Sequence, residues 1–341
     1  KVNKMKQETI TMEKPKLDFF ETEKGIKLVK DTFERKLAEK LSLKRVSAPR
    51  FLVVGTGLQD DLAGTQTPVS FKVKFTKKTV EIVHSLAKWK RYALGKYGFK
   101  PRTGLYTDMD AIRKDEDVSP IHSIYVDQWD WERIISKEER SIEFLKSIVT
   151  KIYSAIVTTE EIITKEFPVL ESKLPKEIIF VYAEEAEEMY PCLTPKEREY
   201  ELAKKYGAVF LIGIGYPLKS GKPHDVRAAD YDDWSTKTSK GHGLDGDIIV
   251  WDSIRKDSME LSSMGIRVDA DTLIKQLEMA DLSERKELEF HKGVIDGSIP
   301  LTIGGGIGQS RLCMLLLQKA HIGEVQSSVW PEELKETIAL L

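Results

Sequence analysis

The sequence places polar side chains at alternate positions of one extended segment, where they could meet a common ligand. Side chains alternate between the two faces of a strand, so Gln128, Asp130 and Glu132 share one face of this predicted strand. An acidic loop before the strand contains Arg113, and Arg311 opens an apolar helical segment after a glycine-rich run. A guanidinium fork fits a phosphoryl group, but a lone arginine is more often solvated or ion-paired, so the pattern alone identifies no ligand.

Three glycine-rich segments suggest phosphate-binding loops, and each fails the full template. Residues 215–222 have one residue too many between the glycines of a P-loop and lack the Ser or Thr that follows its lysine. Residues 55–60 and 304–309 each lack a glycine that the dinucleotide-binding fingerprint requires. The sequence therefore excludes both of these nucleotide-binding devices.

The elements that must position these residues follow from hydrophobic periodicity and from turn signals. Strands joined by hairpins, with helices grouped elsewhere, indicate an α+β fold with an antiparallel β-sheet flanked by helices. The capping box Ser136-x-x-Glu139 predicts a helix that ends near residue 167, and Thr194-Pro195-x-Glu197 with Gly207 marks the two ends of another. The other predicted elements are helices over 25–43, within 271–292 and over 311–317, and strands over 46–54, 105–114, 123–132, 208–214, 247–251, 260–268 and 303–308.

Composition excludes several classes of protein. The 341 residues carry 53 Lys and Arg against 55 Asp and Glu, so no global basic field favours tRNA or an anionic membrane. Two separated cysteines, Cys192 and Cys313, exclude a disulfide scaffold and a Cys-cluster zinc site and favour a cytoplasmic location. No apolar stretch is long enough for a membrane-spanning helix. We expect a mobile leader over residues 1–16 and a single domain over 17–341.

Three ordered segments resemble the signature motifs of class II aminoacyl-tRNA synthetases. The helix and strand ending at Pro49 resemble the first motif, Arg113 with Tyr125-x-x-Gln128-x-Asp130-x-Glu132 resembles the second, and residues 303–312 resemble the third. Five segments are similar to the ammonia-dependent asparagine synthetases, a synthetase-like family of aspartate–ammonia ligases: residues 84–91, 125–132, 224–227, 230–235 and 260–271. The resemblance runs from about Gly25 to the C-terminal end and implies a class II synthetase-like catalytic core.

This resemblance implies ATP-dependent amidation of L-aspartate with ammonia to L-asparagine, through a β-aspartyl-adenylate and with release of AMP and pyrophosphate. It implies Mg²⁺ with ATP, and a homodimer that forms through the first motif. The balanced charge and the lack of a long apolar stretch predict neither tRNA nor a membrane as a partner. Residue by residue, the resemblance implies catalytic roles for Asp60, Arg113 and Arg311, aspartate binding by Ser85, Lys90, Gln128, Asp130, Asp232 and Ser263, ATP or AMP binding by Arg113, Ser262, Gly305, Gly306 and Arg311, and Mg²⁺ binding by Asp247 and Glu260.

The loop around Asp60 carries the expected chemistry of the nitrogen donor. Asp60 lies in a glycine-flanked loop that could close over the site, where its carboxylate could hold ammonium and take a proton from it. Asp232 and Asp233 are alternatives for this role or for binding the ammonium group of aspartate. Asp61 stands where the resembling family is expected to carry Asn, which changes the charge beside Asp60. Lys88 is expected to be an exposed lysine on a helix turn.

Two other functions stay open on the sequence. A core that charges tRNA with Asp or Asn would share the adenylation chemistry, but the balanced charge argues against it, and no anticodon-binding β-barrel is expected ahead of Gly25. A silent paralogue that binds a nucleotide or an amino acid as a regulatory module is the third possibility. Such a paralogue would have no reason to keep Arg113, Glu260 and Arg311 together.

Free ammonia, rather than glutamine, is predicted to supply the nitrogen. Enzymes that use glutamine need a nucleophilic thiol, whereas Cys192 lies between Pro191 and a predicted helix cap and Cys313 lies in an apolar helix. We expect glutamine to replace ammonium poorly in asparagine formation at equal nitrogen, and Asp60→Asn to impair amidation more than adenylation. Comparable rates with the two donors, in preparations freed of contaminating ammonia, would contradict the prediction. A Cys192→Ser variant that lost glutamine use selectively would also contradict it.

Overall fold

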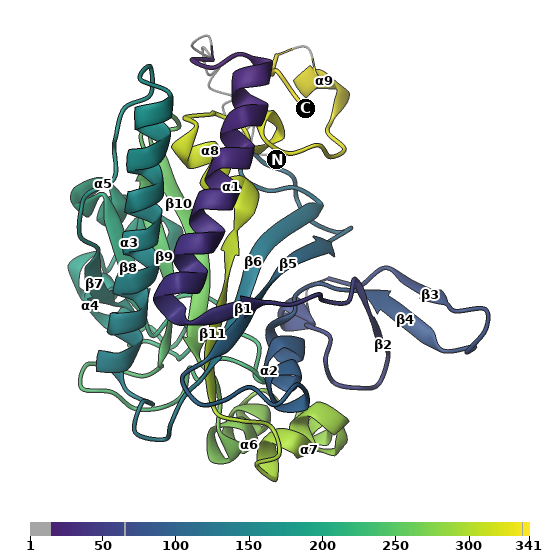
Figure 1. The fold of residues 1–341 in the computed structure, drawn as a ribbon. Helices are drawn as coiled ribbons and strands as arrows, with labels where there is room; N and C mark the ends of the chain where they lie inside the picture. Colours follow the sequence, from purple (N-terminus) through teal and green to yellow (C-terminus); the bar gives the residue numbers. More distant parts are fainter. Residues whose placement is uncertain (1–14, 65, 336) are drawn as a thin grey trace, which may run out of the picture.

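The fold is built around one large β-sheet (Figure 1). The computed structural model describes residues 15–341 except residues 65 and 336, so residues 1–14 of the predicted leader lie outside the described residues. Within the described residues the large sheet has eight strands in the spatial order β1-β5-β6-β11-β10-β9-β8-β7. These strands are β1 (Leu43–Arg45), β5 (Gly104–Ile112), β6 (Tyr125–Ile134), β11 (Thr302–Gly308), β10 (Asp257–Ile266), β9 (Asp245–Asp252), β8 (Ala208–Ile212) and β7 (Ile179–Tyr182).

The interior of this sheet is antiparallel, which confirms the predicted α+β architecture. The two edges differ from the prediction, because β1 pairs in parallel with β5 and β7 pairs in parallel with β8. Parallel neighbours need a long crossover connection, and both crossovers here contain helices. Neither edge strand exceeds four residues, which is too short for an alternating pattern to predict it.

Two long helices cover one face of the sheet, as Figure 1 shows. Helix α1 (Phe19–Leu41) begins at a capping box formed by Asp18 and Glu21, and its buried side chains join the main hydrophobic core. The Phe33 ring of α1 lies 4.7 Å from the Trp129 ring of β6, measured between centroids. The predicted alternation along β6 is therefore confirmed on its apolar face.

Helix α3 (Ile142–Glu166) packs beside α1, and its predicted start was wrong. The Ser136 backbone N–H does donate to Glu139 Oε2, at 2.9 Å, but the two residues close a turn before the helix. The helix begins instead after Ser141, whose side chain accepts a hydrogen bond from the Phe144 N–H. The Ser-x-x-Glu pattern needs only hydrogen bonds between residues three apart. It can therefore form in an isolated turn as well as at the start of a helix.

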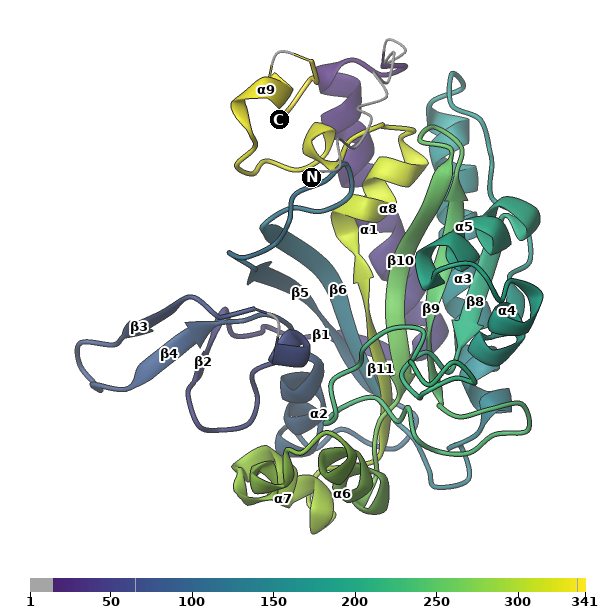
Figure 2. The same cartoon turned by 180° about the vertical axis from the view of Figure 1, so that it is seen from behind.

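The opposite face of the sheet carries shorter elements, seen in Figure 2. Helix α2 (Ala87–Lys96) lies against β6 and β11, and α6 (Ala270–Met279) and α7 (Glu289–Ile295) contact each other beyond the end of the sheet. A separate small sheet has the order β2-β4-β3. Its strands are β2 (Phe51–Val53), β3 (Ser70–Lys72) and β4 (Thr79–Ile82).

The predicted strand over 46–54 is largely wrong, because only β2 lies within it and β2 belongs to the small sheet. Pro49 has no N–H to donate and lies between β1 and β2, so the chain leaves the large sheet before it pairs again.

The helix predicted after Thr194 is confirmed as α5 (Pro195–Tyr206). Thr194 and Glu197 form both halves of its capping box, and Gly207 follows the helix at φ +77°, where glycine is favoured. The remaining helices are α4 (Ala183–Met189), α8 (Gln309–Leu316) and α9 (Glu332–Lys335). In the part of the chain that the structure describes, every helix is too short or too polar to cross a membrane.

The α1 packing can be tested with two phenylalanines of that helix. Phe33 is fully buried against the sheet, whereas Phe20 is 79% exposed. We expect Phe33→Ala to lower the free energy of unfolding by about 3–5 kcal/mol, because it leaves a cavity beside Trp129. Phe20→Ala should change it by less than about 0.5 kcal/mol. Chemical denaturation monitored by tryptophan fluorescence measures both, and equal effects of the two substitutions would contradict this packing.

Candidate functional site

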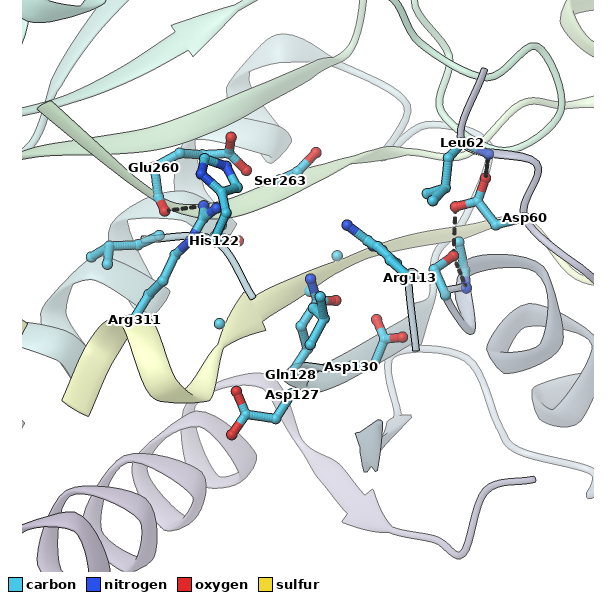
Figure 3. Close-up of a pocket in the computed structure, with 18 of the residues that line it drawn as sticks. Asp60, Leu62, Arg113, His122, Asp127, Gln128, Asp130, Glu260, Ser263 and Arg311 are labelled. Atoms are coloured by element: carbon cyan, nitrogen blue, oxygen red, sulfur yellow. Dashed lines mark hydrogen bonds between the residues drawn. The ribbon is translucent and has the colours of Figure 1, made fainter. Parts of the chain in front are cut away.

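A cavity of about 350 Å³ lies on the sheet face opposite α1 and α3. Figure 3 shows Asp60 and Arg113 toward one side of this cavity and Glu260, His122 and Arg311 toward the other, with Gln128 between them. We call it the main cavity. Of the residues predicted for the site, those that line it are Asp60, Ser85, Lys90, Arg113, Gln128, Asp130, Asp232, Glu260, Ser262, Ser263, Gly305, Gly306 and Arg311.

Strands β6 and β11 form the floor of the main cavity, and glycines make room for its side chains. Gly304 pairs with Glu132 and Gly306 pairs with Asp130 across the two strands. A Cβ atom on Gly304 would lie 1.8 Å from Glu132 Oε2, and one on Gly306 would lie 2.1 Å from Gln128 Oε1. The glycine run therefore gives the polar side chains of β6 the space that side chains of β11 would otherwise fill.

A β-bulge in β10 brings Glu260 and Ser263 to the same cavity, although they are three positions apart. Glu260 pairs with Ile249 of β9, and Ser263 pairs with Asp247, with the register shift between Glu260 and Ser262. In a regular strand, residues three apart point to opposite faces. The extra residue of the bulge changes this, so both side chains face the main cavity.

Buried ion pairs hold the floor of the main cavity together. Arg267 donates to Glu132 through Nε at 3.0 Å and Nη2 at 2.9 Å, and its Nη1 pairs with Asp232. Thr302 Oγ1 donates to the same Glu132 carboxylate at 2.6 Å. Burial opposes the charge of Glu132, but Arg267 and Lys90 offset that effect and lower its pKa. The site therefore keeps a charged network that is fully hydrogen-bonded on the Glu132 side.

Lys90 lies at the centre of this network. It is fully buried, forms an ion pair with Asp130, and donates to the Gly305 carbonyl at 3.0 Å. Burial lowers the pKa of its ammonium group, although Asp130 and Glu132 act in the opposite direction. The two carboxylates favour the charged form of Lys90, and its hydrogen bond to Gly305 anchors it to the floor.

The two predicted arginines are held by carbonyl groups rather than by carboxylates. Arg113 donates to the His84 carbonyl through Nε at 3.3 Å and Nη2 at 3.0 Å. Arg311 donates to the Ile121 carbonyl at 3.2 Å and to the Glu260 carbonyl at 2.8 Å. Among the described residues, neither guanidinium forms an ion pair. Their positive charges therefore remain available to an anion in the main cavity.

Asp60 is buried and is held by hydrogen bonds at the edge of the main cavity. Its Oδ2 accepts hydrogen bonds from Ser85 Oγ at 2.6 Å and from Tyr231 Oη at 3.2 Å, and its Oδ1 accepts one from the Leu62 N–H at 2.9 Å. Burial, with Asp60 and Asp232 nearby, raises the pKa of Tyr231, which keeps its hydroxyl a donor. Three hydrogen-bond donors therefore fix the orientation of the Asp60 carboxylate.

Asp61 and Lys88 lie behind Asp60, and neither lines the main cavity. Asp61 forms an ion pair with Arg285, so its charge is directed away from that cavity. The prediction that Lys88 is exposed was wrong, because it is 2% exposed and its Nζ lies 2.9 Å from Asp230 Oδ2. Asp230 is 142 residues away along the chain, so the sequence around Lys88 gives no sign of this partner.

Asp233, the alternative to Asp232 in the prediction, does not line the main cavity. It forms an ion pair with Arg140 instead.

Asp247, which was predicted to bind Mg²⁺, does not line the main cavity either. It forms an ion pair with Arg227, which does line the cavity. Burial is the main cause that raises the pKa of Asp247 to about 7, with a further contribution from Glu260, although Arg227 opposes the change. Asp247 therefore contacts a residue of the main cavity without lining that cavity itself.

Glu260 fits a magnesium–nucleotide complex better than Asp247 does. Within the described residues, no three or more His, Cys, Asp or Glu side chains are grouped so that they could hold a metal ion. Mg²⁺ bound with ATP needs only one or two carboxylates, since phosphates and water supply its other ligands. Burial opposes the charge of Glu260, but Arg311, Lys196 and Arg227 together lower its pKa, so it remains a carboxylate in the main cavity.

Sequence reasoning assigned no role to several residues of the main cavity. Arg227, Tyr231 and Arg267 lie in segments that carry the family resemblance, so the resemblance could have indicated them as site residues. His122 lies beside Arg311, and burial together with that arginine lowers its pKa. His122 and Gln326 lie in no recognisable pattern, so only the tertiary structure places them in the cavity.

The cysteines lie as predicted with respect to this site. Cys313 is fully buried in α8, where burial raises the pKa of its thiol to about 12. Cys192 is exposed, and neither residue lines the main cavity. Neither thiol is therefore placed to act on a ligand in the main cavity.

Comparisons with known proteins point to one family. Residues 20–340 match the family model described as aspartate-ammonia ligase. Aspartate–ammonia ligase of Parabacteroides distasonis is 53% identical over 322 residues, which cover 94% of this chain and 93% of that protein. The enzyme of the same name from Clostridium tetani is 56% identical over 322 residues, covering 94% of this chain and 92% of that protein.

Solved structures show the same fold at low sequence identity. Asparaginyl-tRNA synthetase of Pyrococcus horikoshii, in complex with asparaginyl-adenylate, aligns with a TM-score of 0.67 at 16% identity. The alignment covers 91% of this chain and 70% of that protein. The predicted class II synthetase-like core is therefore confirmed as a fold.

Proposed function

Because the chain belongs to the aspartate–ammonia ligase family, we propose that its main cavity joins aspartate to ammonia through a β-aspartyl-adenylate. The overall reaction, ATP-dependent formation of asparagine from aspartate and ammonia, follows from that membership. The adenylate, its residue contacts and the metal ion are the proposal. The observation that carries it is the placement of two arginines held by carbonyl groups and of Asp60 around one cavity.

Aspartate fits the polar floor between Asp60 and Gln128. Lys90 offers a cation to the α-carboxylate of aspartate, and Asp130 and Asp232 offer acceptors to its ammonium group. Ser85 donates its hydroxyl hydrogen to Asp60, so its oxygen can only accept a hydrogen bond from aspartate. The remaining polar groups, Gln128 of β6 and Ser263 of β10, line the cavity from the two strands that flank β11. This arrangement leaves the β-carboxylate of aspartate directed toward Arg113.

Adenylation brings two anions together, and the arginines offset their repulsion. A β-carboxylate oxygen attacks the α-phosphorus of ATP, the bond from that phosphorus to the bridging oxygen breaks, and pyrophosphate leaves with the electron pair. Arg113 lies on the Asp60 side, where it stabilises the charge that develops on the α-phosphate. Arg311, on the other side with His122, fits the distal nucleotide.

The rest of the nucleotide site is supplied by Glu260 and by backbone. Mg²⁺ held by Glu260 and the phosphates would neutralise phosphate charge when bound with ATP. Gly305 and Gly306 line the main cavity with backbone, and Ser262 adds a hydroxyl beside them.

Amidation uses Asp60. Ammonium gives one proton to the Asp60 carboxylate, and the resulting ammonia attacks the carbonyl carbon of the adenylate. The new C–N bond replaces the C–O bond to phosphate, AMP leaves with that electron pair, and the nitrogen loses a second proton to solvent. Ser85 and Tyr231 keep the Asp60 carboxylate oriented for this transfer.

The homodimer through the first-motif region near Pro49 and the cytoplasmic location stay part of the proposal. The homodimer is expected from the family resemblance, and the cytoplasmic location is expected from the two separated cysteines.

The reaction itself can be tested by following its products. We expect AMP and pyrophosphate, not ADP, to form from ATP in the presence of aspartate, Mg²⁺ and ammonium. Aspartate-dependent exchange of labelled pyrophosphate into ATP should occur without ammonium, since it reports adenylation alone. Formation of ADP, or acceptance of tRNA in place of ammonium, would contradict the proposal.

Arg113 provides the sharpest variant. Removing one charge-assisted donor from a developing anion raises the barrier by about 3 kcal/mol, so Arg113→Ala should lose about a hundredfold or more in turnover. Lys114→Ala is the matched control, because Lys114 is exposed, pairs with Asp115 and does not line the main cavity. An Arg113→Ala enzyme that kept more than about a tenth of wild-type turnover would exclude Arg113 from the phosphate.

A further inference from the structure

A second cavity, of about 280 Å³, lies on the other side of Asp60. It is lined by the end of β2, the loop that follows, and residues before and in α7, which Figure 2 shows on the side of the small sheet. Asp60 lines both cavities, and it is the residue that they share among those described.

A thin wall separates the two cavities. Around the first turn of α2, Ser85 and Lys90 line the main cavity while Lys88 lines the second cavity. In the segment after Ala229, Tyr231 lines the main cavity and Asp230 lines the second. A single layer of side chains therefore divides the cavities, and the Asp60 carboxylate lies within that layer.

The second cavity contains hydrogen-bond acceptors that lack donors. Asp230 is fully buried, and its Oδ2 accepts from Lys88 at 2.9 Å, His291 at 2.9 Å and Arg285 at 3.2 Å. Its Oδ1 is buried and accepts nothing in the described structure. With all three donors on one oxygen, the other oxygen remains a charged acceptor.

Two other side chains of this cavity have the same property. Asp61 Oδ1 and Gln66 Oε1 are buried without a donor among the described residues. Buried acceptors without donors are rare in folded proteins, so three in one small cavity indicate a ligand that donates hydrogen bonds.

The excess of carboxylates in the second cavity favours a cation as its ligand. Four carboxylates line it, from Asp60, Asp61, Glu81 and Asp230, against the two cationic side chains Lys88 and Arg285. Both cations already donate to carboxylates of the same cavity. A small cation with several N–H donors satisfies the charge and the free acceptors together.

We propose that the second cavity binds ammonium and delivers it to the main cavity through Asp60. The inference rests on the proposed function and adds the route of the nitrogen donor. Ammonium, with four N–H donors, binds the free acceptors of Asp61, Asp230 and Gln66, and passes one proton to Asp60 at the wall. The neutral ammonia that results crosses to the adenylate, where the C–N bond forms and AMP departs. Aspartate and ATP enter by the main cavity, so the substrates do not compete for one entrance.

Two variants test this route. Asp61→Asn removes one charge from the second cavity without touching the main cavity, and should raise the KM for ammonium about five- to tenfold, the difference between a charged and a neutral acceptor. Leu288→Trp fills the second cavity from its outer wall and should raise this KM further. Neither should change the KM for aspartate or the rate of aspartate-dependent pyrophosphate exchange, both of which report the main cavity.

Glu284→Gln is the matched control, because Glu284 is exposed beside Arg285 and does not line either cavity. Its KM for ammonium should equal that of the wild type. Intact exchange with an unchanged KM for ammonium in Asp61→Asn would overturn the proposed route. If Leu288→Trp loses exchange because it folds poorly, Asp61→Asn alone decides. Absence of aspartate-dependent exchange in the wild type would instead refute the proposed function.

Discussion

The buried pairing of Arg267 with Glu132 is the interaction on which the rest of the site depends. It joins the end of β10 to β6, while Thr302 of β11 donates to the same carboxylate and Asp232 takes the remaining side of the guanidinium. Breaking such a pair leaves an uncompensated buried charge, which typically destabilises a protein by about 3–5 kcal/mol. The strands that carry Gln128, Asp130 and the glycine run are therefore held in one register by a polar contact.

One face of the large sheet packs into the main hydrophobic core, and the other face lines the main cavity. Trp129 and Trp131 pack into the apolar layer under α1 and α3, and the alternate residues of β6 face the main cavity. Because the apolar face supplies the hydrophobic free energy, the other face can carry charged groups that a small core could not tolerate. Asp60 lines both cavities, so it connects this polar face to the second cavity.

Local patterns in the sequence determined the parts of this protein that depend on neighbouring residues. The alternation of Gln128, Asp130 and Trp129 follows from the two-residue period of a strand, and the ends of α5 follow from Thr194 and Gly207. The ordered motifs indicated the fold and the residues of the main cavity, because a motif records which residue types occur together. These features need no knowledge of how distant segments pack.

Only the tertiary structure decided the features that arise between distant segments. The bulge beside Glu260 appears in the register of β10 against β9, and burial of Lys88 requires Asp230 from far along the chain. The ion pair of Asp247 with Arg227 likewise joins two segments that are separate in the sequence. A short sequence window specifies the periodicity of its side chains and the caps of its helices. Ion pairs and cavities depend on which distant segments come into contact, and the folding of the whole chain decides that.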